Sequence, residues 1–222
     1  MDFTVISKTG KRSLTVDIKS VAVAGFSGRN IEKMMEQVGQ LEKENIKSPD
    51  YSELPAVYPV SPSLLTQDGS ITVHSHKTSG EVEFLLLKHD GEYYVGLGSD
   101  HTDREIEAED IQRSKEVCPK PISPILWEYY DVKDHLDKVR MLAATRVDGR
   151  AYEYQEGTMA DLLPPIAILN RVSKDVDLED CLIFSGTIPL LRDYRYGDTF
   201  ACRLSDDELG REIELRYTVE VK

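Results

Sequence analysis

Residues 79–100, SGEVEFLLLKHDGEYYVGLGSD, predict a β-hairpin around which the rest of the chain is organised. An apolar run is followed by HDGE, whose Asp-Gly pair is a strong turn signal, and then by a second strand-like run, YYVGLG. Side chains alternate along a strand, so Glu81 and Glu83 share one face with Leu85, while Val82 and Phe84 take the other. Both faces carry bulky apolar residues, which predicts a strand buried on both sides.

Two like charges on a buried strand need compensation. Carboxylates about 6–7 Å apart along a strand that faces an interior repel and raise each other's pKa. A divalent cation removes this conflict, because carboxylate oxygens suit Mg²⁺, Mn²⁺ and Ca²⁺. The hairpin returns Asp100 to the side of Glu81, so Glu81, Glu83 and Asp100 are candidate metal ligands. The alternative is an exposed strand edge, where glutamate is common.

Composition limits the partners of the chain. Its 222 residues are 40% hydrophobic, enough for the core of one compact domain. The net charge of -13 repels phosphate backbones and anionic membranes, so we expect neither nucleic acid nor membrane as a partner. A local cation can still admit an anionic metabolite. We expect a cytoplasmic protein, because the three cysteines are scattered, the N-terminus is polar and no apolar run approaches about 18 residues.

The remaining sequence predicts a mostly β, α+β fold. Polar and apolar residues alternate in two runs over 2–24, which indicates a hairpin, and further strands are expected around the Asp-Gly pair at 148 and in the tail from 181. An amphipathic helix is predicted over 28–45, with another helical segment over 159–176. A short acidic helix or turn in 103–117 brings the expected number of peripheral helices to two or three.

Two shorter motifs offer chemistry of their own. HSHKTSGE places His74 and His76 before Glu81 and resembles the first metal motif of cupins, so a cupin-like metal-binding protein is a minor alternative. The turn Ser185-Gly186-Thr187 offers backbone N–H groups and hydroxyls to a carboxylate ligand, although an ordinary tight turn has the same composition.

Five segments in order resemble the fumarylacetoacetate hydrolase (FAH) superfamily: GEVEFLLL, GSDHTDRE, RSKEVCPKP, VDGRAYEYQEGT and LEDCLIFSGTIP. Within it the chain most resembles a branch of uncharacterised bacterial proteins, DUF2848. The resemblance implies an FAH-like catalytic domain with a β-roll or mixed sheets over 48–222. It also implies an N-terminal hairpin and helix acting as a lid segment over 1–47, the two forming one structural unit, and a homodimer.

The resemblance implies roles for individual residues. Glu81, Glu83 and Asp100 match the carboxylates that hold Mg²⁺ or Mn²⁺, and the same donors are compatible with Ca²⁺. Arg104 and Lys115 match the family's catalytic cations beside the substrate. The further substrate-binding positions are Thr158, Ser185, Gly186 and Thr187.

The implied function is a divalent-metal-dependent enzyme acting on a small anionic 2-oxo or β-diketo acid. Its reaction would be C–C hydrolysis, hydration, decarboxylation or tautomerisation through a metal-stabilised enolate. The family's water-activating His–Glu pair has no counterpart in GFSGRN, so His101 or His76 is the candidate replacement base. The alternative is a non-catalytic protein that binds a carboxylate metabolite.

Overall fold

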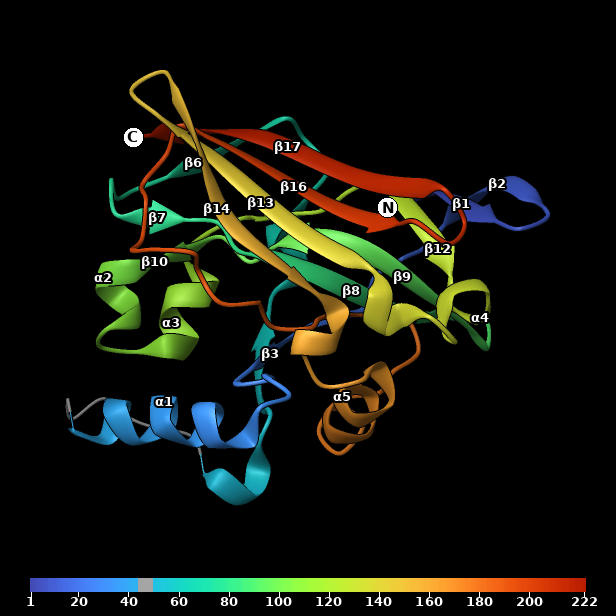
Figure 1. Ribbon diagram of the computed structural model, residues 1–222, viewed down its shortest axis with the longest axis horizontal. Helices are drawn as coiled ribbons and strands as arrows, with labels where there is room; N and C mark the ends of the chain where they lie inside the picture. Colours follow the sequence, from blue (N-terminus) through green and yellow to red (C-terminus); the bar gives the residue numbers. More distant parts are fainter. Residues whose placement is uncertain (44–49) are drawn as a thin grey trace.

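The computed structural model describes residues 1–43 and 50–222, in which two mixed β-sheets face each other across a shared core (Figure 1). The eight-stranded sheet contains, in spatial order, β2 (Gly10–Thr15), β1 (Asp2–Ser7), β12 (Ile125–Glu128), β9 (Glu92–Ser99), β8 (Val82–His89), β15 (Cys181–Phe184), β3 (Ser20–Gly25) and β4 (Ala56–Val60). The five-stranded sheet contains β14 (Arg150–Thr158), β13 (Arg140–Val147), β16 (Thr199–Asp206), β17 (Arg211–Val221) and β6 (Ser70–Val73). Two short pairs complete the sheets: β7 (Thr78–Ser79) with β10 (Thr102–Asp103), and β5 (Leu65–Thr66) with β11 (Lys120–Pro121).

Strand β8 is buried on both faces, as its sequence predicts. Phe84 and its alternate neighbours face the five-stranded sheet, where they join Met141 of β13 in one core cluster. Leu85 and Leu87 face the opposite way and pack with Leu126 in a second cluster. The predicted hairpin is confirmed, with β8 and β9 antiparallel and joined at the Asp-Gly turn. A strand with two apolar faces therefore forms the centre of the molecule.

The predicted mostly β fold is confirmed, with short helices at its periphery. The described part of the chain has five α-helices: α1 (Ile31–Lys43), α2 (Arg104–Glu107), α3 (Ile111–Glu116), α4 (Tyr129–Val132) and α5 (Pro165–Val172). Four 3₁₀ segments accompany them: η1 (Tyr51–Glu53), η2 (Pro62–Leu64), η3 (Leu136–Lys138) and η4 (Met159–Asp161). Figure 1 shows α1 and α5 below the sheets and α2 and α3 together beside β10.

The acidic segment 103–117 forms two helices instead of one. Asp103 accepts hydrogen bonds from the backbone N–H groups of residues 105 and 106, which starts α2. Asp110 accepts one from the N–H of residue 113, which starts α3. Each aspartate satisfies N–H groups that have no intrahelical partner, so the second cap begins a new helix. This break is one reason why the described residues form five α-helices, more than the two or three that the sequence predicts.

The N-terminal run 2–24 contains the predicted hairpin, formed by β1 and antiparallel β2, but it also contains a further strand. Its second half divides into β2, which pairs with β1, and β3, which pairs with β4 and β15. Both halves contribute to the same eight-stranded sheet as β8.

The proposed boundary between residues 47 and 48 lies outside the described residues, so the division into a lid segment and a catalytic domain stays a prediction.

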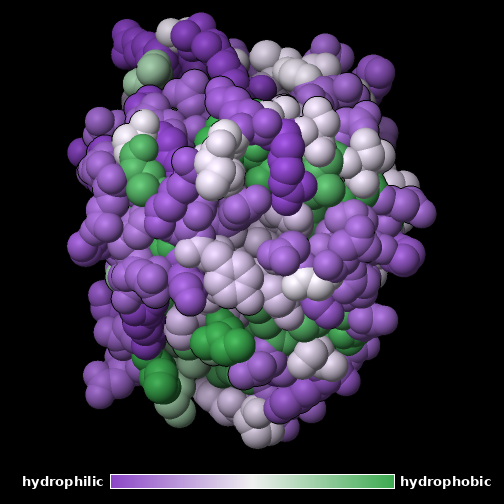
Figure 2. Space-filling model, turned by 90° about the vertical axis from the view of Figure 1, so that its right-hand side faces the viewer, coloured by the Kyte–Doolittle hydropathy of each residue, from purple (hydrophilic) through white to green (hydrophobic). Residues whose placement is uncertain are grey.

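The surface agrees with the acidic composition. Figure 2 shows a face on which hydrophilic side chains dominate and apolar ones form small separate patches. Within the described ranges, every helix is too short or too polar to cross a membrane.

Candidate active site

Three carboxylates meet where the central hairpin opens. Glu81 directly precedes β8, Glu83 lies on it, and Asp100 directly follows β9. The pairing of Val82 with Ser99 sets this register, and the Asp100 N–H donates to the Glu81 carbonyl at 3.1 Å. One carboxylate oxygen from each residue lies within 4.8 Å of the other two. The structure thus brings the three predicted ligands together.

The carboxylates are buried, and burial shifts their pKa values in different directions. Glu83 is 1% exposed, and burial followed by the charge of Asp100 raises its pKa well above the usual range. Burial also raises the pKa of Glu81, against the opposing effect of Arg104. For Asp100, burial is outweighed by the ammonium groups of Lys115 and Lys120, so its pKa is lowered. The cluster therefore contains one strongly ionised carboxylate and two that resist ionisation.

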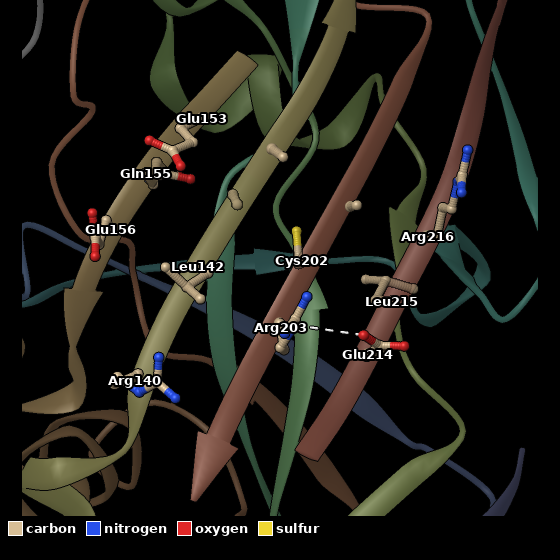
Figure 3. A pocket seen from close by; sticks show the side chains of 13 residues that line it. Arg140, Leu142, Glu153, Gln155, Glu156, Cys202, Arg203, Glu214, Leu215 and Arg216 are labelled. Carbon is tan, nitrogen blue, oxygen red and sulfur yellow. Dashed lines mark ion pairs between the residues drawn. The ribbon is translucent and has the colours of Figure 1, made fainter. Parts of the chain in front are cut away.

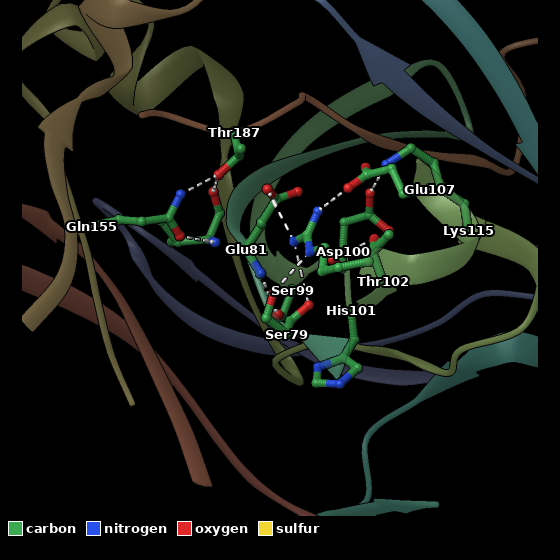
Figure 4. A network of polar contacts seen from close by, with 12 residues as sticks. Ser79, Glu81, Ser99, Asp100, His101, Thr102, Glu107, Lys115, Gln155 and Thr187 are labelled. Carbon is green, nitrogen blue, oxygen red and sulfur yellow. Dashed lines mark hydrogen bonds and ion pairs between the residues drawn. The ribbon is translucent and has the colours of Figure 1, made fainter. Parts of the chain in front are cut away.

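Arg104 and Lys115, the two predicted cations, reach the cluster from helices α2 and α3. An Arg104 Nη2 lies 3.1 Å from Glu81 Oε1, while its Nη1 donates to Glu107 at 2.7 Å. Lys115, in the last turn of α3, donates to Asp100 Oδ2. Figure 4 shows Lys115 and Glu107 on one side of Asp100, with Gln155 and Thr187 beyond Glu81 on the other. Both predicted cations are bound to carboxylates of the cluster.

Lys120 is a third cation that the sequence interpretation missed. Its side chain is fully buried, and Nζ lies 3.0 Å from Asp100 Oδ1. The same Nζ donates to the His101 carbonyl at 2.6 Å. Lys120 lies between two prolines in CPKPISP, within the segment RSKEVCPKP that carries part of the family resemblance. Lys115 and Lys120 together flank Asp100.

The turn at 185–187 supports the carboxylates from the far end of β15. The Gly186 N–H donates to Glu83 Oε2 at 2.9 Å. Gly186 has φ +81°, and a Cβ there would lie 2.0 Å from Ser27 Oγ and 2.6 Å from the Ala24 carbonyl. Only glycine fits this position. Ser185 Oγ donates to the neighbouring Gly186 carbonyl. Within the turn predicted to bind substrate, the Gly186 N–H therefore donates its hydrogen bond to Glu83.

Gln155 of β14 is a second residue that the sequence interpretation missed. Its Oε1 accepts from the Val82 N–H at 2.9 Å, and its Nε2 donates to Thr187 Oγ1 at 2.8 Å and to the Ile188 carbonyl at 2.6 Å. Thr187 donates its own hydroxyl proton to the Val82 carbonyl. Its hydroxyl can therefore accept from a ligand but has no second proton to donate. Gln155 lies in VDGRAYEYQEGT, one of the five segments that carry the family resemblance, but its partners come from distant strands and appear only in the structure.

The structure does not bring every predicted residue to the cluster. His101 is fully buried, with Nδ1 3.0 Å from the Tyr217 hydroxyl and Nε2 2.9 Å from Thr78 Oγ1, and it points away from the carboxylates (Figure 4). Burial, reinforced by Lys120 and Arg104, lowers its pKa to about 3. With both ring nitrogens occupied, His101 lacks the access that a general base needs.

Thr158 and the two histidines of HSHKTSGE also make no described contact with the cluster. The Thr158 N–H donates to Asp161 Oδ2 at 2.8 Å, where it begins η4. Two groups of described residues could hold a metal: Glu81, Glu83 and Asp100, and His89, Glu179 and Asp180. His74 and His76 belong to neither group. The cupin-like alternative therefore receives no support from their placement.

Three tyrosines surround the charged groups. The Tyr194 ring centroid lies 4.4 Å from Arg104 Cζ, and the Tyr58 ring lies 6.0 Å from Lys115 Nζ. Burial raises the pKa of Tyr58 to about 12. The Tyr154 hydroxyl is buried and has no hydrogen-bond partner in the described part of the chain. These phenols are protonated at neutral pH and can donate to an anionic ligand.

The residues present fit a divalent cation. Asp100 Oδ1 is buried and receives no hydrogen bond from the described residues, although Lys120 Nζ lies nearby. A cation at about 2.0–2.6 Å from each ligand can join oxygens spaced like those of Glu81, Glu83 and Asp100. The donors are all carboxylate oxygens, which favour Mg²⁺, Mn²⁺ or Ca²⁺ over softer metals.

A separate depression of about 480 Å³ lies on the five-stranded sheet (Figure 3). Leu142, Ala144 and Ala201 line it, with Arg203 and Glu214 paired at 3.5 Å beside them. Leu142 and Ala144 alternate with core residues of β13, so the depression occupies the outer face of the sheet. It is thus on the opposite face from the carboxylates.

Family comparison assigns the chain. The model of the family described as "Protein of unknown function (DUF2848)" matches residues 24–217. The chain belongs to the DUF2848 family. Among curated proteins, none matches this DUF2848 chain in sequence.

Solved structures share the fold of the DUF2848 chain. A 2-keto-3-deoxy-D-arabinonate dehydratase complexed with magnesium and 2,5-dioxopentanoate matches with a TM-score of 0.63 and 16% identity, over 98% of this chain and 78% of the other. A candidate fumarylpyruvate hydrolase from Burkholderia cenocepacia matches with a TM-score of 0.64 and 17% identity, over 100% and 96% of the two chains. A candidate fumarylacetoacetate hydrolase family protein from Yersinia pestis CO92 matches with a TM-score of 0.64 and 17% identity, over 97% and 100%. The family match confirms the resemblance to DUF2848, and the shared fold agrees with the FAH-like fold which that resemblance implied.

Proposed function

We propose that this DUF2848 protein is a divalent-metal-dependent enzyme acting on a small anionic 2-oxo or β-diketo acid. The observation that carries the proposal is the convergence of Glu81, Glu83 and Asp100 with buried cations. A structural neighbour of the same fold was solved with magnesium and 2,5-dioxopentanoate, which supports a hard cation and a small oxo acid. Mg²⁺ or Mn²⁺ is the proposed cofactor, and the donor set also suits Ca²⁺.

The protein's own groups suit an acid with adjacent oxygens. Glu81, Glu83 and Asp100 would hold the metal, which when bound supplies positive charge that stabilises enolate chemistry on a 2-oxo acid. Arg104 and Lys115 bring positive charge to the same place for a substrate carboxylate. In this proposal Ser185, Gly186 and Thr187 form one wall of the substrate site, and Thr187 accepts a hydrogen bond from the substrate.

The reaction type follows from which proton-transfer groups are present. Burial raises the pKa values of Tyr58, Tyr154 and Tyr194, so these phenols stay protonated at neutral pH and cannot take up a proton as bases. Among the described residues, neither His101 nor His76 makes a contact with the carboxylates. C–C hydrolysis and hydration both need a base to activate or accept a water proton. We therefore favour decarboxylation, or ketonisation of an acid that binds as its enolate, because each consumes no water and needs only a proton donor at carbon.

A carboxylate-binding protein without catalysis is the second candidate, and the buried His101 favours it. Calorimetric titration with Mg²⁺ of wild type and Glu83→Ala tests the premise that both candidates share. Heat in wild type that is absent in the variant supports the metal site, while equal heats contradict it.

Turnover then separates enzyme from binder. We expect oxaloacetate or an acylpyruvate to lose its enol absorbance in the presence of protein and Mg²⁺, and the loss to disappear in Glu83→Ala. A metal-loaded protein inactive across a panel of such acids would support the non-catalytic candidate.

We also propose that the protein acts as a homodimer. The outer face of the five-stranded sheet offers small apolar side chains at Leu142, Ala144 and Ala201, with arginine and glutamate around them (Figure 3). A face with both charges can pair with its own copy. Sedimentation velocity should give twice the chain mass for wild type and the chain mass for Leu142→Glu. A wild-type monomer would contradict the proposal.

A further inference from the structure

The carboxylate cluster already contains its own positive charges. Its acidic members are Glu81, Glu83, Asp100 and Glu107, and its basic members are Arg104, Lys115 and Lys120. Three cations in contact with four carboxylates leave little net charge in the cluster without a metal. A divalent cation that enters must therefore meet repulsion from these internal cations as well as attraction to the carboxylates.

Lys115 holds the position on Asp100 that matters most for this repulsion. Its side chain is 7% exposed and that of Asp100 is fully buried, so neither charge is screened well by water. Lys115 donates to Asp100 Oδ2, one of the two oxygens that Asp100 can offer to a metal. An ammonium and a divalent cation cannot both be held closely by one carboxylate without strong mutual repulsion.

Lys120 also contacts Asp100 but is held elsewhere. Its Nζ donates to the His101 carbonyl, and its backbone belongs to β11, which pairs with β5. Lys115 lies in the last turn of a six-residue helix, and its Nζ has Asp100 as its one hydrogen-bond acceptor in the described residues. Lys115 can therefore leave Asp100 without breaking another hydrogen bond.

We propose that Lys115 is a displaceable counter-ion, which binds Asp100 in the metal-free protein and is released when a divalent cation binds. The released ammonium remains largely buried and needs a new anion, which the carboxylate of a 2-oxo acid supplies. Metal binding and acid binding are then mutually favourable, because the metal frees the cation that the acid requires. This inference rests on the proposed function and gives it an order, with metal first and acid second.

Calorimetric titration with Mn²⁺ in chelator-stripped buffer tests the counter-ion role. The variants are Lys115→Met, which removes the ammonium, and Lys115→Gln, which keeps a hydrogen-bond donor without the charge. Lys77→Met is the matched control, because it removes one positive charge from a side chain that is 54% exposed and pairs with Glu105. We expect both Lys115 variants to bind Mn²⁺ at least about tenfold more tightly than wild type, and Lys77→Met to bind like wild type.

The outcomes separate this inference from the function on which it rests. Equal or weaker binding in Lys115→Met and Lys115→Gln, with clear binding in wild type, would overturn the counter-ion role and leave the metal site intact. No Mn²⁺ binding in any variant would overturn the proposed function itself.

Thermal melting gives a second measurement if a variant is poorly folded. In chelator, Lys115→Met should melt below wild type, and Mn²⁺ should raise its melting temperature more than that of wild type. A smaller rise than in wild type would contradict the proposal.

Pyruvate tests the second half of the proposal, the coupling between metal and acid. It should tighten Mn²⁺ binding in wild type and do so less in Lys115→Met. An undiminished effect of pyruvate would contradict the second half of the proposal.

Discussion

Substitution of Gly186 by alanine should destabilise the protein by far more than the same change at an ordinary turn glycine. Gly186 has φ +81° and is enclosed by the segment at 24–27. A Cβ there would lie 2.0 Å from Ser27 Oγ and 2.6 Å from the Ala24 carbonyl. One of these neighbours is a short side chain and the other is backbone of the packed strand β3, so the clash cannot be relieved by a simple rotation.

The cost has two parts. A residue with a Cβ in the left-handed region costs about 1–2 kcal/mol, and insertion of a methyl group into a filled site costs about 1–3 kcal/mol more. Gly186→Ala should therefore lose about 2–5 kcal/mol of unfolding free energy. Gly149→Ala is the matched control, because Gly149 has φ +76° but nothing within 4 Å of the added Cβ. It should lose only the first part, about 1–2 kcal/mol.

Urea denaturation of wild type and both variants measures the difference directly. The same substitution moves the Gly186 N–H that donates to Glu83, so Gly186→Ala should also bind Mg²⁺ more weakly than Gly149→Ala does. Equal stability of the two variants would refute the close packing of the turn against Ala24 and Ser27. It would also remove the reason for glycine at this position.

Two further changes test the buried polar groups. Glu83→Gln should stabilise the metal-free protein, because burial and Asp100 oppose ionisation of Glu83 and so raise its pKa. Because the pKa of Glu83 is higher in the folded than in the unfolded protein, the unfolding free energy of wild type falls as pH rises through this range. In chelator, the gain in unfolding free energy from Glu83→Gln should therefore be larger at pH 8 than at pH 5. A gain that does not depend on pH would contradict the raised pKa of Glu83. Gln155→Leu should lower the unfolding free energy by about 1–3 kcal/mol, because the buried Val82 N–H loses its hydrogen-bond acceptor. Urea denaturation measures this loss, and an unchanged midpoint would show that the Val82 N–H finds another acceptor.

The central hairpin could be predicted because its determinants are local. The Asp-Gly turn fixes the register of β8 and β9, and that register alone places Asp100 beside Glu81. Apolar residues on both faces of β8 likewise predicted its burial from alternation. The helix over 28–45 followed from spacing in the same way and is α1, described over Ile31–Lys43.

The surroundings of the carboxylates depend on contacts that sequence spacing does not encode. Lys115 and Lys120 stand five residues apart, on helix α3 and on the short strand β11, and the structure shows that both reach Asp100. His101 adjoins Asp100 in the chain, yet the chain turns there, with the His101 N–H bonded to the Ser99 carbonyl, and the His101 ring lies behind the cluster. Gln155 comes from the other sheet, so its role follows only from how the two sheets pack.

The most direct test of the metal site is a crystal structure of the protein soaked with Mn²⁺, with anomalous scattering recorded to locate the ion. We expect one strong anomalous peak within about 2.0–2.6 Å of oxygens from Glu81, Glu83 and Asp100. Lys115 Nζ should no longer contact Asp100 in that structure. The absence of a peak between these carboxylates at saturating Mn²⁺, or a peak confined to the group of His89, Glu179 and Asp180, would contradict the central claim.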